Sequence, residues 1–197
     1  MSAAPKPRKL TVAEYLAIEN AAERKSEFYD GEMFLMAGAS PDHNAIKDNL
    51  IVEIGGRLRG SPCRTYSSDQ RVKVDATGLF TYPDIVIVCD RPQFDADDPL
   101  ALTNPVALVE VLSPGTAGYD RGTKFRHYQQ MPSVREVVLV SQDRVFVEVF
   151  VRQPDGSWRL TVADDPAGEL ALSTLPVRVP LADVYRGVKV PDRPPLR

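Results

Sequence analysis

The pattern of apolar and polar residues predicts two helices in the first third of the chain. Thr11 forms a capping box with Glu14 and opens a short helix that reaches about residue 19. Ser40 and Pro41 supply an N-cap and a first-turn proline for a longer helix that ends near residues 60–62. His43 lies on the apolar face of this helix and should point inward. Apolar residues recur along that face at Ile46, Leu50, Ile54 and Leu58.

Runs typical of β-strands fill most of the remaining chain. Residues 25–37 are predicted to form a hairpin, because Asp30 and Gly31 are the favoured pair for a tight type I′ turn. The apolar runs 85–89 and 106–112 are typical of strands that are covered on both faces. A helix from about 120 to 130 separates them from a strand at 136–141 and a hairpin through 145–151. This mixture predicts an α/β or α+β fold with a central mixed sheet flanked by helices.

Composition is that of an ordinary globular protein and predicts a single domain. The chain has 197 residues, of which 43% are hydrophobic and 26% are charged. We expect one domain over residues 11–188, a disordered lead at 1–10 and a flexible tail at 189–197. Because the formal net charge is −3, any nucleic-acid footprint must be local rather than spread over a basic surface.

The lack of a long apolar run and the small number of cysteines suggest a cytoplasmic protein. No apolar run approaches the ~20 residues of a membrane span, so no membrane association is expected. Cys63 and Cys89 are too few for a disulfide scaffold and suit a reducing compartment. With His43 and His127 they show neither a CxxC nor an HxxxH spacing, which disfavours a structural zinc site.

Two predicted central strands each carry a carboxylate where an apolar residue is expected. Asp84 precedes the run 85–88, and Glu110 interrupts the run 106–112. A buried, unpaired carboxylate costs several kcal/mol, so two near each other suggest a shared cation such as Mg²⁺. Lys124 on the next helix shares its inward face with Tyr128, and its ammonium could reach the same end of the sheet.

Each of these three residues also has a purely structural interpretation. Asp84 could cap a turn after Pro83, and Glu110 could form a buried salt bridge with an arginine. Lys124 taken alone would most often be a surface residue. The combination of Pro-Asp, a glutamate on a strand and a lysine on the following helix is what favours a functional site.

Four segments carry a resemblance to a known family. They are "EFYDGEMFLMAGASPDHNAI", "YPDIVIV", "LVEVLSPGTAGYDRGTKFRHY" and "VREVVLV". Together they resemble the Uma2 family (DUF820), bacterial proteins placed among the PD-(D/E)xK nucleases with the restriction-endonuclease-like fold. The resemblance runs from about Leu10 to Val188. It departs from the superfamily pattern at Leu112, where the lysine two residues after the second acid would stand; in Uma2-like sequences that lysine has moved to the helix, at Lys124.

The resemblance implies a metal-dependent endonuclease that hydrolyses phosphodiester bonds in DNA. Asp84 and Glu110 would hold Mg²⁺, with Mn²⁺ as a possible substitute, and the backbone carbonyl of Val111 would add a ligand. Lys124 would assist the attack of water, and Glu27 would be a further acidic member of the site. His43 and Tyr128 are secondary candidates.

Two expectations remain open beside this one. Cleavage of duplex DNA by a fold with one site commonly needs two subunits, which suggests a homodimer. The alternative function is a nucleic-acid-binding or regulatory protein that retains the nuclease fold and is catalytically weak or inactive; the low overall basicity and the displaced lysine favour it.

Overall fold

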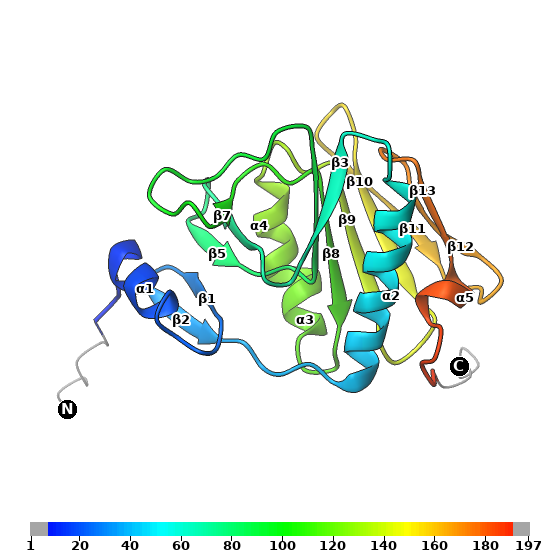
Figure 1. Ribbon diagram of the computed structural model, residues 1–197, viewed down its shortest axis with the longest axis horizontal. Coiled ribbons are helices and arrows are strands. Elements are labelled where there is room, and N and C mark those ends of the chain that lie inside the picture. The colour runs from blue at the N-terminus through cyan, green and yellow to red at the C-terminus, as the bar shows by residue number, and fades with distance from the viewer. Residues whose placement is uncertain (1–7, 191–197) are drawn as a thin grey trace.

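A six-stranded mixed sheet forms the centre of the molecule (Figure 1). The computed structural model describes residues 8–190 of the chain. β8 (Ala107–Leu112) runs parallel to β9 (Glu136–Ser141), and the other neighbouring strands of this sheet are antiparallel. In spatial order the strands are β11 (Trp158–Ala163), β10 (Val147–Arg152), β9 (Glu136–Ser141), β8 (Ala107–Leu112), β6 (Ile85–Cys89) and β3 (Cys63–Ser67). The mixed sheet that the sequence predicts is therefore confirmed.

A second sheet, which the sequence pattern does not separate from the first, carries the N-terminal hairpin. Its strands lie in the order β2 (Glu32–Leu35), β1 (Ser26–Tyr29), β5 (Leu79–Thr81), β4 (Arg71–Val74) and β7 (Ala101–Leu102). The chain passes from this sheet into the central one through residues 82–84, between β5 and β6. A third, two-stranded sheet pairs β12 (Glu169–Leu172) with β13 (Val177–Pro180).

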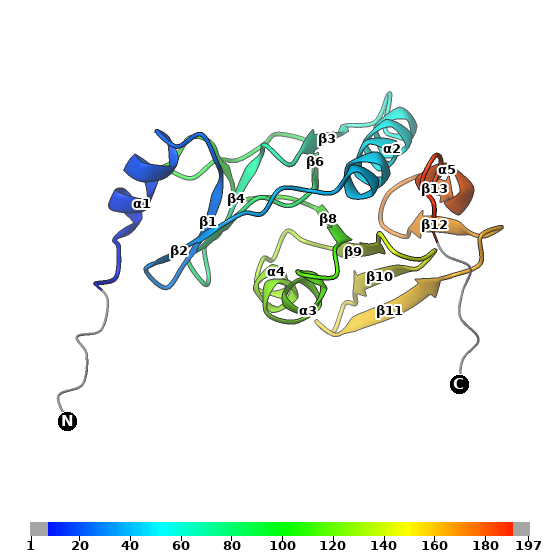
Figure 2. The same ribbon diagram turned by 90° about the horizontal axis from the view of Figure 1, so that it is seen from below.

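Helices cover both faces of the central sheet. Figure 2 shows α2 (Pro41–Arg57) on one face, and α3 (Ala117–Tyr119) with α4 (Phe125–Gln129) on the other. A single π-helical turn, η1 (Asp120–Lys124), joins α3 to α4. α1 (Val12–Glu19) packs beside the N-terminal hairpin, and α5 (Leu181–Val184) lies against α2. Among residues 8–190, no helix has both the length and the apolar character that crossing a bilayer requires.

The side chains of β8 point alternately to the two faces of the central sheet, so they contribute to two separate core clusters. Val109 and Val111 join the cluster that contains the apolar stripe of α2. Leu108 and Leu112 join the other cluster, with Phe125 of α4. Because successive strand residues point to opposite faces, Glu110 lies on the same face as Leu108 and Leu112, toward η1 and α4.

Local signals in the sequence identify most helix starts and turns correctly. Both bonds of the Thr11 and Glu14 capping box are present, and Asp30 and Gly31 have the positive φ values, 47° and 80°, of a type I′ turn. The helix expected at about 120–130 is instead three short segments that begin at Ala117. The reason is the extra residue of the π turn, which apolar spacing does not reveal.

The chain ends were expected to form a disordered lead and a flexible tail. Residues 1–7 and 191–197 lie outside the described part, so these expectations remain predictions there. The described residues next to them make contacts. The N–H of Leu10 donates to the carbonyl of Gly31, and Val190 packs against the central core.

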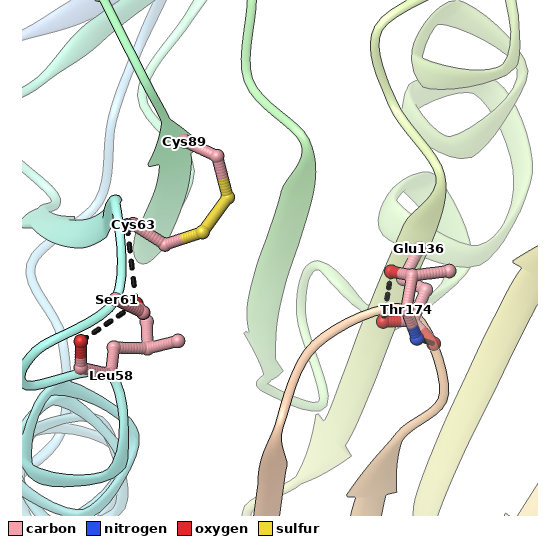
Figure 3. The surroundings of a disulfide bond; sticks show 6 residues. All are labelled: Leu58, Ser61, Cys63, Cys89, Glu136 and Thr174. Carbon is pink, nitrogen blue, oxygen red and sulfur yellow. Dashed lines mark hydrogen bonds between the residues drawn. A yellow bond between two sulfur atoms is a disulfide. The ribbon is translucent and has the colours of Figure 1, made fainter.

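Cys63 and Cys89 form a disulfide, which the cysteine count did not suggest. The two residues are direct partners in the antiparallel pairing of β3 with β6, and Figure 3 shows the bond joining the edge strand to its neighbour. The pairing follows from sheet register, which brings together residues 26 positions apart in the chain. Figure 3 also shows Glu136 beside Thr174, whose hydroxyl donates to the Glu136 carboxylate at 2.8 Å.

Candidate active site

Asp84 and Glu110 lie side by side at one end of the paired strands β6 and β8. Ile85 pairs with Val109 in antiparallel register, so the residue before Ile85 faces the residue after Val109. The backbone N–H of Val111 donates to Asp84 Oδ2 at 2.8 Å, which fixes the Asp84 carboxylate against β8. Val111, proposed to act through its carbonyl, thus contacts the site through its N–H.

Lys124 enters the same place from the π turn. Its Nζ lies 2.9 Å from Glu110 Oε1, 3.1 Å from Glu27 Oε1 and 3.7 Å from Asp120 Oδ1. The lysine side chain is only 5% exposed, and Glu110 is equally buried. The partner of Glu110 is therefore this lysine and not an arginine. Lys124 is buried and is not a surface residue.

Glu27 reaches the site from the second sheet. It lies on β1, and the hydroxyl of Thr81, on the neighbouring strand β5, donates to Glu27 Oε1. Tyr119 of α3 donates to Glu27 Oε2 at 3.0 Å. The carboxylate is therefore held by donors from two elements besides Lys124, and the site lies where the two large sheets meet.

The secondary candidates also lie at this site. The Tyr128 hydroxyl, one turn beyond Lys124, donates to Glu110 Oε1. His43 Nε2 lies 3.3 Å from Asp84 Oδ2, and its Nδ1 is a buried atom without a hydrogen-bond partner in the described structure. These contacts join Glu27, Lys124, Glu110 and Tyr128 into one group. His43 pairs with Asp84, whose carboxylate is bonded to β8 through the backbone N–H of Val111. Their chemical roles remain predictions.

The pKa shifts of the site reflect several buried acidic side chains that share one buried cation. Burial raises the pKa of Glu110 to about 8; Asp120 and Asp84 add to the increase, and Lys124 opposes it. Burial likewise raises the pKa of Asp120. Burial also works to raise the pKa of Glu27, but Lys124 and Thr81 outweigh it and the pKa is lowered.

Lys124 itself stays protonated. Burial alone would lower its pKa, but Glu110, Tyr128 and Glu27 together outweigh that effect and hold the pKa well above the ordinary value. One ammonium group is thus shared among carboxylates that repel one another, which leaves an excess of negative charge if all of them ionise.

A divalent cation fits the chemistry of these donors. The oxygens of Asp84 and Glu110 are hard ligands, and one more positive charge would oppose the burial, and the lesser repulsion from Asp120 and Asp84, that raise the pKa of Glu110. Among residues 8–190, however, no three histidine, cysteine, aspartate or glutamate side chains are grouped closely enough to hold a metal ion. The fit is to an ion such as Mg²⁺, which commonly uses one or two carboxylates and completes its shell with water.

Three contributors to the site were missed from the sequence. Asp120 precedes Lys124 by four residues, a spacing that could have indicated the contact. Thr81 and Tyr119 carry no comparable signal, because they join the site only through Glu27. Arg71 of β4 is also buried, and it pairs with Asp98 at 2.6 Å.

Comparison with known proteins gives a consistent result along most of the chain. Residues 12–182 match the model of the family Uma2, described as "Putative restriction endonuclease". Two uncharacterized proteins from Synechocystis sp. are similar: slr1290 is 34% identical and sll1609 is 35% identical. The first alignment covers 94% of this chain and 95% of the relative, and the second covers 85% and 95%.

A solved structure with the same fold is among the matches. It is the crystal structure of a "putative nuclease belonging to DUF820" from Anabaena variabilis, with a TM-score of 0.73 and 19% sequence identity. The superposition covers 91% of this chain and 98% of that one. At this identity the likeness concerns the fold alone, and it confirms the predicted nuclease-type architecture.

Proposed function

We propose that this chain, which belongs to the Uma2 family, is a metal-dependent endonuclease that hydrolyses phosphodiester bonds in DNA. The family supports a restriction-endonuclease-like nuclease in general; the metal, the DNA substrate and the residue roles are our proposal. The observation that carries it is the buried ion cluster, in which Lys124 Nζ lies 2.9 Å from Glu110 while Asp84 stands opposite Glu110 on the next strand.

Asp84 and Glu110 are the proposed ligands of Mg²⁺, with Mn²⁺ as a substitute and the carbonyl of Val111 as a further ligand. When bound, the ion would polarise a water molecule and neutralise charge on the scissile phosphate. The hydrogen bond from the Val111 N–H holds Asp84 Oδ2, so the Asp84 carboxylate is oriented before any ligand arrives.

Lys124 and Glu27 act together in this proposal. Lys124 keeps its positive charge because its pKa is held well above the ordinary value, and a fixed ammonium stabilises the negative charge that develops at the phosphate. Glu27 is ionised, since its pKa is lowered overall, and it can orient the attacking water or accept a hydrogen bond from it. Tyr128 and Tyr119 hold Glu110 and Glu27 in position through their hydroxyl groups.

Two measurements test this function together. Mg²⁺ or Mn²⁺ should raise the melting temperature of the wild-type protein, and Asp84→Ala should abolish that increase. The wild type should also cleave DNA only when the metal is present, and Glu110→Ala should abolish cleavage. The substrates should include single-stranded, duplex, branched and modified DNA, because the family match specifies none of them.

The outcomes separate nuclease from binding module. If metal binds and no form of DNA is cleaved, the protein is a nucleic-acid-binding or regulatory relative that retains the fold. The lysine that already neutralises Glu110 and Glu27 favours this second function, because it stabilises the cluster without a metal. If neither binding nor cleavage is found, the assignment of the site is wrong.

The proposal includes two features of the protein beyond its site. We expect a homodimer, because cutting both strands of a duplex with one site per subunit is simplest with two subunits. We also expect a cytoplasmic location, where the substrate DNA is found; the disulfide between Cys63 and Cys89 would then be exposed to reduction.

A further inference from the structure

His43 occupies a position that hydrogen bonding does not explain. Its side chain is 13% exposed, and its Nδ1 is buried with no partner in the described structure. Its Nε2 lies 3.3 Å from Asp84 Oδ2, a contact that is an ion pair only if the imidazole is protonated. A buried polar atom without a partner is unfavourable, and the other ring nitrogen, Nε2, is the atom of this imidazole that faces the carboxylates.

The N-cap of α2 holds the backbone of His43 in place. Ser40 caps α2, and its hydroxyl accepts a hydrogen bond from the His43 N–H at 3.1 Å. The same hydroxyl donates to Gln142 Oε1 at 3.1 Å, which ties the start of α2 to the chain beyond β9. The imidazole therefore lies at the capped N-terminal end of α2, beside Asp84.

The spacing between His43 and Asp84 suits two ligands of one ion. Two atoms that each lie about 2.1 Å from an octahedral ion are about 3.0 Å apart when they occupy adjacent positions. The 3.3 Å between His43 Nε2 and Asp84 Oδ2 is close to this value. Oδ2 already accepts the N–H of Val111, and a carboxylate oxygen has a second lone pair for a metal.

We propose that His43 is a metal ligand through Nε2, and that it makes the site select a first-row transition ion such as Mn²⁺ over Mg²⁺. The inference rests on the proposed function, since it concerns the ion that Asp84 and Glu110 would bind. Mg²⁺ strongly prefers oxygen ligands, whereas imidazole nitrogen adds affinity for transition ions. No three side chains among residues 8–190 form a ready-made metal group, so in this geometry His43 and Asp84 would be the paired protein ligands and water would complete the shell.

Pulsed electron paramagnetic resonance of the full-length, untagged protein with Mn²⁺ tests this directly. A coordinated imidazole gives a ¹⁴N hyperfine coupling to Mn²⁺, which a merely nearby histidine does not. The chain has two histidines, so His127→Gln is the matched control. His127 Nδ1 lies 2.9 Å from the hydroxyl of Thr77, outside the carboxylate cluster. We expect the coupling in the wild type and in His127→Gln, and its loss in His43→Ala and His43→Gln.

Binding constants supply a second readout that does not depend on cleavage. Losing a ligand should weaken Mn²⁺ binding about tenfold or more. The same substitutions should weaken Mg²⁺ binding, measured by competition with Mn²⁺, by no more than about threefold. Circular dichroism and melting temperature confirm that each variant is folded, and His43→Gln preserves side-chain volume if His43→Ala does not fold.

The inference and the proposed function can fail separately. If Mn²⁺ binds and supports cleavage but the ¹⁴N coupling is absent or survives in His43→Gln, His43 is no ligand and the nuclease function stands. If the coupling is present and lost in both His43 variants but no DNA is cleaved, the metal site is correct and the nuclease function fails. If no Mn²⁺ binds, both are wrong.

Discussion

Lys124 is the residue whose charge matters most to the stability of the site. It contacts Glu110, Glu27 and Asp120 while being almost fully buried. A buried carboxylate is tolerated only when a cation or hydrogen bonds offset the loss of its hydration. The lysine therefore has a structural role that holds with or without catalysis.

Replacing Lys124 by methionine should destabilise the metal-free protein strongly. Removing one partner of a buried ion pair costs about 3–5 kcal/mol, because the remaining carboxylates lose their cation. Urea unfolding at neutral pH measures this change in the free energy of unfolding. Added Mg²⁺ should recover more stability in Lys124→Met than in the wild type, since the ion replaces the missing charge.

Lys73→Met is the matched control for that experiment. Lys73 also pairs with two carboxylates, Asp75 and Asp95, but Asp75 is largely exposed. The Lys73–Asp95 pair is partly buried, with side-chain exposures of 20% and 10%, so the control should lose less stability than Lys124→Met and gain none specifically from Mg²⁺. Equal losses in the two variants would contradict the special role of Lys124.

Glu110 should make the stability of the metal-free protein fall as pH rises. Its pKa is about 8 in the folded protein, where burial raises it above the ordinary value of 4.5. Between these values the folded state keeps a proton that the unfolded state releases, so the stabilisation present below about pH 4.5 is lost by about pH 8. Urea unfolding at several pH values in EDTA measures the slope.

Glu110→Gln should remove this part of the pH dependence, because glutamine does not titrate. Saturating Mg²⁺ should reduce the slope in the wild type, since the ion favours the ionised carboxylate. A slope that is the same in wild type and Glu110→Gln would show that Glu110 titrates at its ordinary pKa.

At the level of elements, the pairing of β6 with β8 positions the two acids, and the segment from α3 to α4 delivers the lysine. The π turn at Asp120–Lys124 directs Asp120 and Lys124 toward the sheet together, with Tyr128 one turn later. Single-turn π bulges often occur at functional sites, which agrees with the position of this one. The apolar spacing of the sequence indicated the helix but not its extra residue.

The disulfide between β3 and β6 should stabilise the protein measurably. It closes a loop between residues 26 positions apart, and a cross-link over such a loop contributes about 3.5 kcal/mol in the chain-entropy estimate. Dithiothreitol should therefore lower the melting temperature of the wild type by several degrees. The double variant Cys63→Ser/Cys89→Ser should melt at the reduced protein's temperature and should not respond to the reductant.

If dithiothreitol leaves the wild-type melting temperature unchanged, the two thiols are not bonded in solution. That result would agree with the reducing compartment suggested by the small number of cysteines. Mass spectrometry after thiol alkylation distinguishes the two states directly.

At the level of the whole molecule, the site joins two sheets that fold from different parts of the chain. Glu27 comes from the second sheet, Asp84 from the segment that links the sheets, and Glu110 from the middle of the central one. Lys124 bonds to both Glu27 and Glu110 and so connects the sheets electrostatically.

We expect the protein to be a dimer in solution. Light scattering coupled to size-exclusion chromatography should give twice the chain mass of 21.8 kDa. The measurement should be repeated with Mg²⁺ and a duplex, because the partner surface could form only on the substrate. A strict monomer under all these conditions, at high protein concentration, would refute the homodimer.

The sequence by itself determined the starts of α1 and α2, the turn at Asp30 and Gly31, and the strands at about 85–89 and 106–112, and it singled out Asp84, Glu110 and Lys124 as candidates. These features depend on local backbone preferences and on hydrophobic periodicity, which neighbouring residues encode. The polar residues Asp84 and Glu110 were identifiable because they interrupt apolar surroundings where a charge is costly.

Only the tertiary structure decided what those residues contact. The division into two large sheets, the disulfide and the approach of His43 to Asp84 depend on register and packing between segments far apart in the chain. The same holds for Thr81 and Tyr119, which are ordinary residues in the sequence and become part of the site through Glu27. Long-range contacts are selected by the free energy of the whole fold, and no local pattern specifies them.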